Sequence, residues 1–235
     1  MSVTVFVKGS NDHFKVHKEL GDCPSSQRIV MILRLKGVQF HQEFVDLTKK
    51  DTKKWEEFVR RTQGRLKPPV LIHGDVEPIE DADTIVGYLE ETFREPDLKS
   101  LNAQANIAGC DLYSKFALFM RNSIPDNDAK LRAALVKELK KLNEFLDKES
   151  PGAYLDGDML KLPDCNLLPK LMHIKEAGEL KDFTIPEEFE AISTYLREAQ
   201  RQRAFKETFI EPVKHDIKQG WRKKMGNSMS SNSRR

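Results

Sequence analysis

The first 93 residues alternate between short apolar runs and longer stretches with helical spacing. The runs are rich in Val, Ile and Phe, which favour strands, and the stretches between them repeat apolar residues every three to four positions. Strands are predicted at 3–7, 38–45, 70–72 and 76–79, and helices are predicted to begin at Pro24, to span 52–62 and to begin after Asp81. In this β-α-β-α-β-β-α order the first two strands should be parallel and the last two antiparallel.

The pattern changes after a short connection that contains Pro96. From residue 103 it is helical throughout, with helices predicted at 103–122, 128–148, 164–177 and 186–203. From Lys214 the periodicity is lost, which predicts a disordered end. The expected organisation is an α/β domain at 1–93, a linker at 94–102, an all-α domain at 103–212 and a basic tail at 213–235.

Composition places the chain among globular proteins. Its 235 residues are 39% hydrophobic and 32% charged. No apolar run approaches the roughly 18 residues of an ordinary membrane-spanning helix, and no charged-then-apolar leader is visible. The three cysteines are widely spaced and odd in number, which argues against a disulfide framework. We therefore expect a cytoplasmic protein in a reducing compartment.

The net charge of +2 is divided unevenly along the chain. Residues 200–235 carry a net charge of +7, and the remaining residues carry −5. A basic end of this kind either increases solubility alone or contacts acidic lipid, nucleic acid or an acidic partner.

Cys23 is the leading candidate for chemistry. It stands at the start of a predicted helix, where backbone N–H groups and the helix dipole stabilise a thiolate, and Arg28 adds positive charge one turn later. Ser26 occupies the place of the second thiol in a Cys-x-x-Cys motif, so no disulfide can form between these positions. Exchange with a small thiol such as glutathione stays open. The alternative is a buried, unreactive cysteine.

Two other positions could complete a ligand site. In a thioredoxin-like arrangement a cis-proline opens the strand that faces the reactive cysteine, and Pro68-Pro69 precedes the strand at 70–72. The alternative is a rigid turn with both peptide bonds trans. The helix start at Asp81-Ala82 could hold a ligand carboxylate through backbone N–H groups, or Asp81 could simply cap the helix.

Metal and nucleotide chemistry are not predicted. His13 and His17 lie four apart in a polar loop without further ligands. Cys110 and Cys165 stand near apolar residues and are expected in the core. The sequence also lacks the glycine motifs of nucleotide-binding proteins and the nucleophile elbow of hydrolases.

Three segments resemble one family. Gly-Asp-Cys-Pro-Ser-Ser-Gln-Arg at 21–28 is similar to the Gly-Asn-Cys-Pro-Phe-Ser/Cys-Gln-Arg motif of the chloride intracellular channel proteins. Leu-Pro-Asp-Cys-Asn-Leu-Leu-Pro-Lys-Leu at 162–171 is nearly identical to another run of that family, and it is very specific. Phe-Thr-Ile-Pro-Glu-Glu-Phe at 183–189 resembles a third. The resemblance covers residues 3–210.

The resemblance implies a glutathione-transferase-like fold, with a thioredoxin-like first domain and an all-helical second domain. It implies a redox centre at Cys23 and a glutathione site made of Cys23, Pro68, Pro69, Asp81 and Ala82. Proteins of this family are soluble, can associate with membranes and are linked to chloride conductance. Some show weak glutathione-dependent oxidoreductase activity.

The family's proposed membrane segment corresponds to residues 23–45, which here carry several charges. Arg28, Arg34 and Lys36 lie in it, and each central charge costs about 2.5–3.5 kcal/mol on insertion scales. The segment is therefore expected to be an ordinary helix and strand, although these three cations could line a pore in an oligomer.

Other departures affect the expected site and one helix start. Ser25 replaces the usual aromatic residue beside the thiol, and Ala82 stands where related glutathione sites carry a hydroxyl. Lys161 replaces the threonine of a helix capping box, which leaves Asp164 to bond backbone N–H groups alone.

Three functions stay open. The first is a chloride intracellular channel-like protein whose soluble form associates with intracellular or plasma membranes and is linked to chloride conductance or membrane trafficking. The second is a glutathione-dependent monothiol oxidoreductase that uses Cys23. The third is a non-catalytic adaptor that binds proteins through its helical domain or basic tail. The expected partners are membrane lipid, chloride, glutathione and proteins, without metal or nucleic acid.

Overall fold

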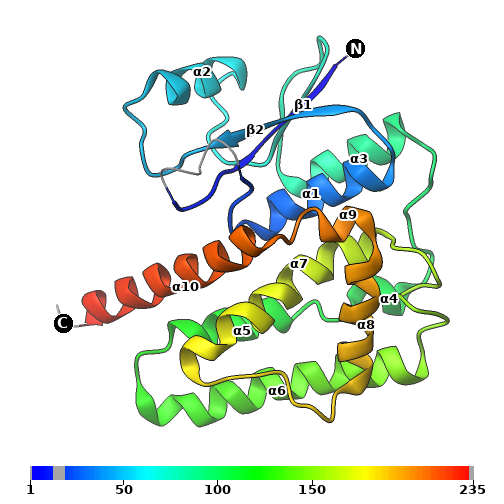
Figure 1. Cartoon of the computed structure of the whole chain (residues 1–235), viewed down its shortest axis with the longest axis vertical. Coiled ribbons are helices and arrows are strands. Elements are labelled where there is room, and N and C mark those ends of the chain that lie inside the picture. The colour runs from blue at the N-terminus through cyan, green and yellow to red at the C-terminus, as the bar shows by residue number, and fades with distance from the viewer. Residues whose placement is uncertain (1, 13–18, 233–235) are drawn as a thin grey trace. The chain divides into compact units, whose positions relative to one another are not determined.

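The computed structural model describes residues 2–12 and 19–232, with side chains through Gly226. Figure 1 shows the strands and helices that these residues form. The chain divides into two compact units, one comprising Met1–Lys99 and Arg203–Asp216 and the other Ser100–Gln202 and Ile217–Arg235. His13 and His17 lie outside the described residues.

The first unit is built on a mixed sheet in the order β2-β1-β3-β4. β1 (Val3–Lys8) pairs in parallel with β2 (Phe40–Val45) and antiparallel with β3 (Val70–His73), which pairs antiparallel with β4 (Ile79–Glu80). These directions confirm both predicted pairs. β4 begins later than predicted, because the chain first turns at 74–76 before it rejoins the sheet.

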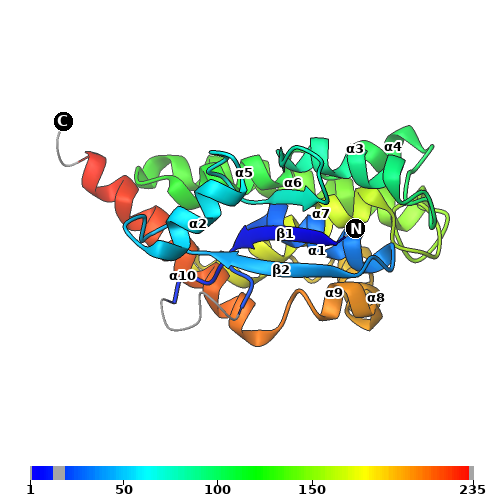
Figure 2. The ribbon, with the colours of Figure 1, turned by 90° about the horizontal axis from the view of Figure 1, so that it is seen from above.

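Helices cover both faces of this sheet. α1 (Pro24–Leu35) and α3 (Ala82–Thr92) lie on one face, and α2 (Lys53–Arg61) lies on the other (Figures 1 and 2). Alternation along β1 explains the two layers. Phe6 packs in a cluster with Phe58 of α2, whereas the buried Val5 and Val7 point to the opposite face.

The second unit is helical. Its elements are α4 (Ala103–Ile107), α5 (Leu112–Arg121), α6 (Pro125–Lys148), α7 (Leu162–Ala177), the 3₁₀ turn η1 (Gly178–Lys181) and α8 (Glu190–Arg201). α7 is buried along most of its surface, and Cys165 is fully buried in it, as predicted. The helix predicted at 103–122 is divided at Gly109, whose φ of +69° breaks the helical path.

Two expectations differ from the structure. Cys110 is exposed, because it lies in the turn between α4 and α5 rather than on a buried helix face. The tail is not disordered at its start, since residues 211–232 form α10 (Glu211–Asn232). Val213, Ile217 and Trp221 of α10 are buried, and their spacing of four is that of one helix face.

The described residues contain no helix that is both long and apolar enough to cross a membrane. Over the same residues no three His, Cys, Asp or Glu side chains are grouped so that they could hold a metal ion.

Candidate functional site

The strand register brings two of the predicted site residues to the same end of the sheet. Val70, the first residue of β3, pairs with Phe6 of β1 and with Glu80 at the end of β4. Pro69 precedes Val70, and Asp81 follows Glu80. Pro69 and Asp81 therefore leave neighbouring strands at one sheet end.

The start of α1 reaches that sheet end as well. The backbone N–H of Lys8, the last residue of β1, donates to Ser26 Oγ in the first turn of α1 at 3.1 Å. Cys23 is the N-cap residue of this helix. The peptide bond between Pro68 and Pro69 is cis, as in the thioredoxin-like arrangement considered above. Cys23 thus belongs to the sheet end from which Pro69 and Asp81 extend.

Cys23 is only partly buried, unlike Cys165. Its backbone is extended (φ −95°, ψ 110°), and its carbonyl oxygen accepts the N–H of Gln27 at 3.0 Å, which starts the helix. Ser26, at the position of a second thiol, is fully buried and holds the end of β1. The site therefore presents one thiol, and the neighbouring hydroxyl is structural.

A second thiol introduced at position 26 tests whether Cys23 lies at the start of α1 as described. We expect the Ser26→Cys variant to form an internal disulfide with Cys23 under mild oxidation, because the spacing becomes that of a Cys-x-x-Cys motif at a helix start. Thiol titration of the unfolded chain should then fall by two relative to its reduced form. Leu33→Cys, on the same helix but buried elsewhere, is the control. A titration that stays unchanged after oxidation of Ser26→Cys would contradict the placement.

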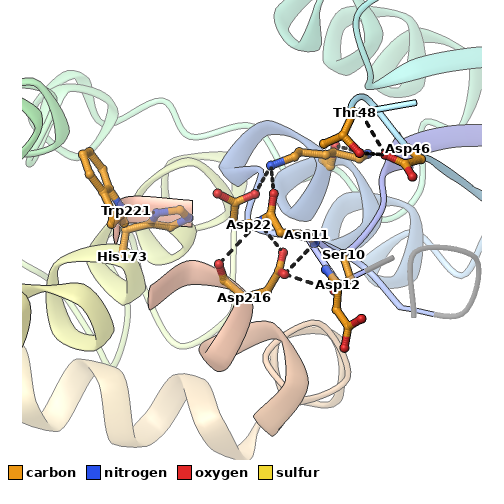
Figure 3. A network of polar contacts seen from close by, with 12 residues as sticks. Ser10, Asn11, Asp12, Asp22, Asp46, Thr48, His173, Asp216 and Trp221 are labelled. Carbon is orange, nitrogen blue, oxygen red and sulfur yellow. Dashed lines mark hydrogen bonds and ion pairs between the residues drawn. The ribbon is translucent and has the colours of Figure 1, made fainter. Parts of the chain in front are cut away.

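A charged network lies immediately before Cys23 (Figure 3). Asp22, whose side chain is 1% exposed, forms an ion pair with Lys8. Lys8 Nζ also donates to Asn11 Oδ1 at 3.1 Å, and Asn11 donates its backbone N–H and Nδ2 to the carboxylate of Asp216 at 2.6 and 2.9 Å. Ser10 Oγ donates to the same carboxylate at 3.0 Å. Within the first unit, the loop that carries Cys23 is thereby tied to Asp216.

Burial raises the pKa of the Asp216 carboxyl, and the negative charge of Asp22 adds to this effect. Hydrogen bonds from Asn11 and Ser10 and the charge of Lys8 act in the opposite direction. Sequence analysis missed these residues. Lys8 and Asp22 could have been found as charges beside a buried strand and a candidate nucleophile. Asp216 lies 205 residues from Asn11, and its role depends on the helix that was expected to be disordered.

Asp81 is the N-cap of α3, as in the simpler of the two interpretations of that position. Its Oδ1 accepts the backbone N–H groups of Asp83 and Thr84, each at 3.0 Å. These hydrogen bonds lower the pKa of Asp81, and the one from the Thr84 N–H contributes most. Arg28 of α1 donates to Asp83 Oδ1 at 2.6 Å and joins the starts of α1 and α3. The adjacent Ala82 is the first helical residue.

Arg34, the second of the three cations that could line a pore, is held in a surface cluster. Arg34 forms an ion pair with Glu207, whose other carboxylate oxygen accepts Arg203 Nε of α9 (Arg203–Lys206) at 2.6 Å. Partial burial lowers the pKa of Arg34, and the charge of Arg203 adds to the shift. Arg34 thus connects α1 to the segment just before α10.

Lys36, the third cation that could line a pore, is buried. Its side chain is 0% exposed, and that of Glu90 is 2% exposed, with Nζ and Oε1 2.9 Å apart. Nζ also donates to the carbonyl oxygens of Phe93 at 2.7 Å and Pro96 at 2.9 Å. Lys36 therefore combines one ion pair with two hydrogen bonds inside the first unit, where this cation fixes the end of α1 to the end of α3.

Comparison with known proteins decides the family. A family model described as the CLIC-like N-terminal domain matches residues 1–96. The human chloride intracellular channel protein 3 is 34% identical over 222 residues, which cover 87% of this chain and 89% of that protein. The chain belongs to the chloride intracellular channel family.

Solved structures share its fold. The dehydroascorbate reductase of Chlamydomonas reinhardtii matches with a TM-score of 0.79 and 26% identity over 95% of this chain and 98% of that one. The chloride intracellular channel homologue EXC-4 from C. elegans matches with a TM-score of 0.78 and 22% identity, over 95% and 82%. Glutathione S-transferases share the fold as well, which confirms the predicted transferase-like architecture of this family member.

Proposed function

We propose that this chloride intracellular channel family member binds glutathione at the sheet end formed by Cys23, Pro68, Pro69, Asp81 and Ala82, and exchanges disulfides there through Cys23 alone. The observation that carries the proposal is the partly exposed thiol at the start of α1, beside a buried Ser26 that cannot resolve a disulfide. The residues present fit a thiol tripeptide, since they combine a free thiol, the start of α1, which no side chain caps, and the cis-Pro69 peptide at one sheet end.

The Cys23 thiolate attacks the glutathione sulfur of a disulfide between glutathione and a substrate. A new S–S bond forms between Cys23 and glutathione, and the substrate sulfur leaves as a thiolate that takes up a proton. A second glutathione thiolate then attacks this mixed disulfide, which returns the Cys23 thiolate and releases oxidised glutathione. The two electrons that reduce the substrate come from two molecules of glutathione. The match to a dehydroascorbate reductase at 26% identity supports chemistry of this class.

The test is glutathione-dependent reduction of 2-hydroxyethyl disulfide, coupled to NADPH oxidation through glutathione reductase. We expect the full chain to catalyse it and the Cys23→Ser variant to fall to the rate without protein, because the nucleophile is lost. Cys110→Ser removes an exposed thiol outside the site and should keep the wild-type rate. A Cys23→Ser variant as active as wild type would contradict the proposal.

Family membership favours a second candidate function, in which a cytoplasmic folded form associates with acidic membranes and contributes to chloride conductance or trafficking. Arg34 and Lys36 are engaged inside the folded chain, so conductance through residues 23–45 would require α1 to leave these contacts. The exposed Arg222 and Lys223 of α10 supply positive charge for a first electrostatic contact with lipid.

Vesicle co-sedimentation tests that contact. We expect binding to vesicles that contain phosphatidylserine, weaker binding at high salt, and about a tenfold loss or more in Arg222→Glu/Lys223→Glu, since each basic residue near the surface contributes about 1 kcal/mol. The matched control, Lys130→Glu/Lys137→Glu, reverses two exposed charges on α6. Equal binding to neutral vesicles would contradict an electrostatic contact with lipid. If neither vesicle binding nor disulfide reduction is observed, the result would favour an adaptor that binds protein partners.

A further inference from the structure

One residue of the first unit contacts the chain on both sides of Cys23. This residue is Lys8, the last residue of β1. Its carbonyl oxygen accepts the N–H of Gly21 at 2.9 Å, and its own N–H donates to Ser26 Oγ at 3.1 Å. Its ammonium forms the ion pair with Asp22. Lys8 therefore holds the segment that carries the thiol through three separate groups.

The backbone contacts of Lys8 fix where this segment lies. Gly9 and Leu20 form a β bridge directly beside them, so the chain returns along the end of β1. A Cβ atom on Gly21 would lie 2.2 Å from the carbonyl oxygen of Gly9, which only a glycine avoids. Replacing the Lys8 side chain leaves these contacts in place, since on the Lys8 side they use backbone atoms only.

The side chain of Lys8 determines the charge beside the thiol. Asp22 directly precedes Cys23, and its side chain is buried, so water and salt screen its negative charge poorly. A negative charge near a thiol disfavours the thiolate, which is the nucleophilic form. The partly buried ammonium of Lys8 supplies the opposite charge. Because the pair is neutral as a whole, Asp22 can be buried beside Cys23 without suppressing the thiolate.

Two further charged groups lie near this segment. Lys8 Nζ also donates to Asn11 Oδ1 at 3.1 Å, and Asn11 donates twice to the carboxylate of Asp216 (Figure 3). Asp216 therefore acts on the ammonium through Asn11. Arg28, one turn after the thiol, donates to Asp83 Oδ1 at 2.6 Å and is directed to the start of α3. The ion pair of Lys8 is thus the contact that balances the charge next to the thiol.

We propose that Lys8 is a positioning residue for Cys23: its backbone fixes the thiol at the start of α1, and its ammonium neutralises Asp22 so that the thiolate forms. The inference rests on the proposed function, because it concerns the nucleophile of that reaction. It goes beyond that function by assigning the charge balance to a residue outside the proposed glutathione site. Lys8 makes and breaks no bond itself, and its effect on the thiol passes through Asp22.

The pH dependence of Cys23 alkylation tests the role of the ammonium. The full chain carrying Cys110→Ser is treated with iodoacetamide over a series of pH values, and the adduct at Cys23 is quantified by peptide mapping. Iodoacetamide reacts with the thiolate, so the rate rises with pH to a plateau. We expect Lys8→Met to move the curve to higher pH by about one unit, which lowers the rate below the plateau about tenfold.

Removal of the other charge should have the opposite effect. Asp22→Asn leaves the ammonium without this counter-charge beside the thiol, so the curve should move to lower pH by about one unit. Lys8→Met/Asp22→Asn removes both charges and should return the curve close to that of the parent chain. Lys8→Arg keeps the positive charge and should behave as the parent does. Purely structural damage would instead move both single variants in the same direction and add in the double variant.

Lys36 offers the matched control, because it forms a buried ion pair with Glu90 at the other end of α1. Lys36→Met also loses a buried ammonium from the first unit. It should leave the alkylation curve in place, since that ammonium does not balance a charge beside the thiol.

The proposal is overturned if Lys8→Met and Asp22→Asn leave the curve unchanged or move it in the same direction. If Lys8→Met does not fold, Asp22→Asn decides alone, and a curve that does not move to lower pH overturns the proposal. Alkylation needs no glutathione. The expected shifts together with absent disulfide reduction would therefore support this role of Lys8 and contradict the proposed function alone.

Discussion

Replacing Lys36 with alanine is expected to lower the free energy of unfolding by about 3–5 kcal/mol. Lys36 and Glu90 are both buried, and Lys36 also donates to two carbonyl oxygens. The variant leaves the Glu90 charge and two buried acceptors without their partner, and that desolvation cost is no longer offset. Urea unfolding followed by circular dichroism measures the change.

Two variants separate the buried ion pair from the loss of a lysine in general. Lys141 pairs with Glu138 on the exposed face of α6, and Lys141→Ala should cost about 1 kcal/mol or less. The double variant Lys36→Met/Glu90→Leu removes both charges and should recover much of the stability, because apolar replacements of a buried pair are often neutral. A Lys36→Ala variant as stable as Lys141→Ala would contradict the buried placement.

The Asp164→Ala substitution is expected to lower the free energy of unfolding by about 3 kcal/mol or more, since it leaves several buried donors without an acceptor. Asp164 is fully buried at the start of α7. Its carboxylate accepts the N–H of Leu155 at 3.0 Å, the N–H of Lys161 at 2.9 Å and the hydroxyl of Tyr195 at 2.9 Å. The expectation that Asp164 bonds backbone N–H groups alone is therefore wrong, because a tyrosine on α8 also donates to it.

Asp158 offers the matched control for Asp164. It also accepts a backbone N–H, that of Ala153 at 3.1 Å, but it is exposed. Water replaces the lost acceptor at an exposed site, so Asp158→Ala should cost about 1 kcal/mol or less. Equal losses in Asp164→Ala and Asp158→Ala would show that burial does not set the cost.

The same carboxyl predicts a pH dependence. Burial raises the pKa of Asp164 above its ordinary value, while its three hydrogen bonds oppose the shift. The folded chain then keeps this proton to higher pH than the unfolded chain does. The contribution of the Asp164 carboxyl to stability therefore falls as the pH rises from its pKa in the unfolded chain to its raised pKa in the folded chain. Above the raised pKa this contribution is constant. Urea unfolding across that range should show this component in wild type and not in Asp164→Asn; identical profiles would contradict it.

The order of elements in the first unit could be predicted because its signals are local. Val3–Val7 holds three valines and a phenylalanine, Pro24 fits a first helical turn, and Asp81 is a helix cap, as expected. The end of the chain could not be predicted from its composition. The buried spacing of Val213, Ile217 and Trp221 is visible in the sequence but is hidden among lysines and small polar residues.

The candidate site likewise has residues that local sequence predicts and residues that it does not. Cys23 stood out from its own position at a helix start, and strand order then explains how Pro69 and Asp81 come to its sheet end. The roles of Lys36 and Asp216 could not be foreseen, since each depends on residues from another element. Arg34 and Lys36 show the consequence most clearly, because their ion-pair partners, Glu207 and Glu90, lie far from them in the sequence.

The central claim is that Cys23 is a single reactive thiol that forms a mixed disulfide with glutathione. Intact mass spectrometry of the Cys110→Ser chain after incubation with oxidised glutathione tests it most directly, because the other remaining cysteine, Cys165, is buried. We predict one glutathione adduct for each chain, located at Cys23 by peptide mapping and absent from Cys23→Ser/Cys110→Ser. A chain that stays unmodified, or an adduct located at Cys165, would contradict the account.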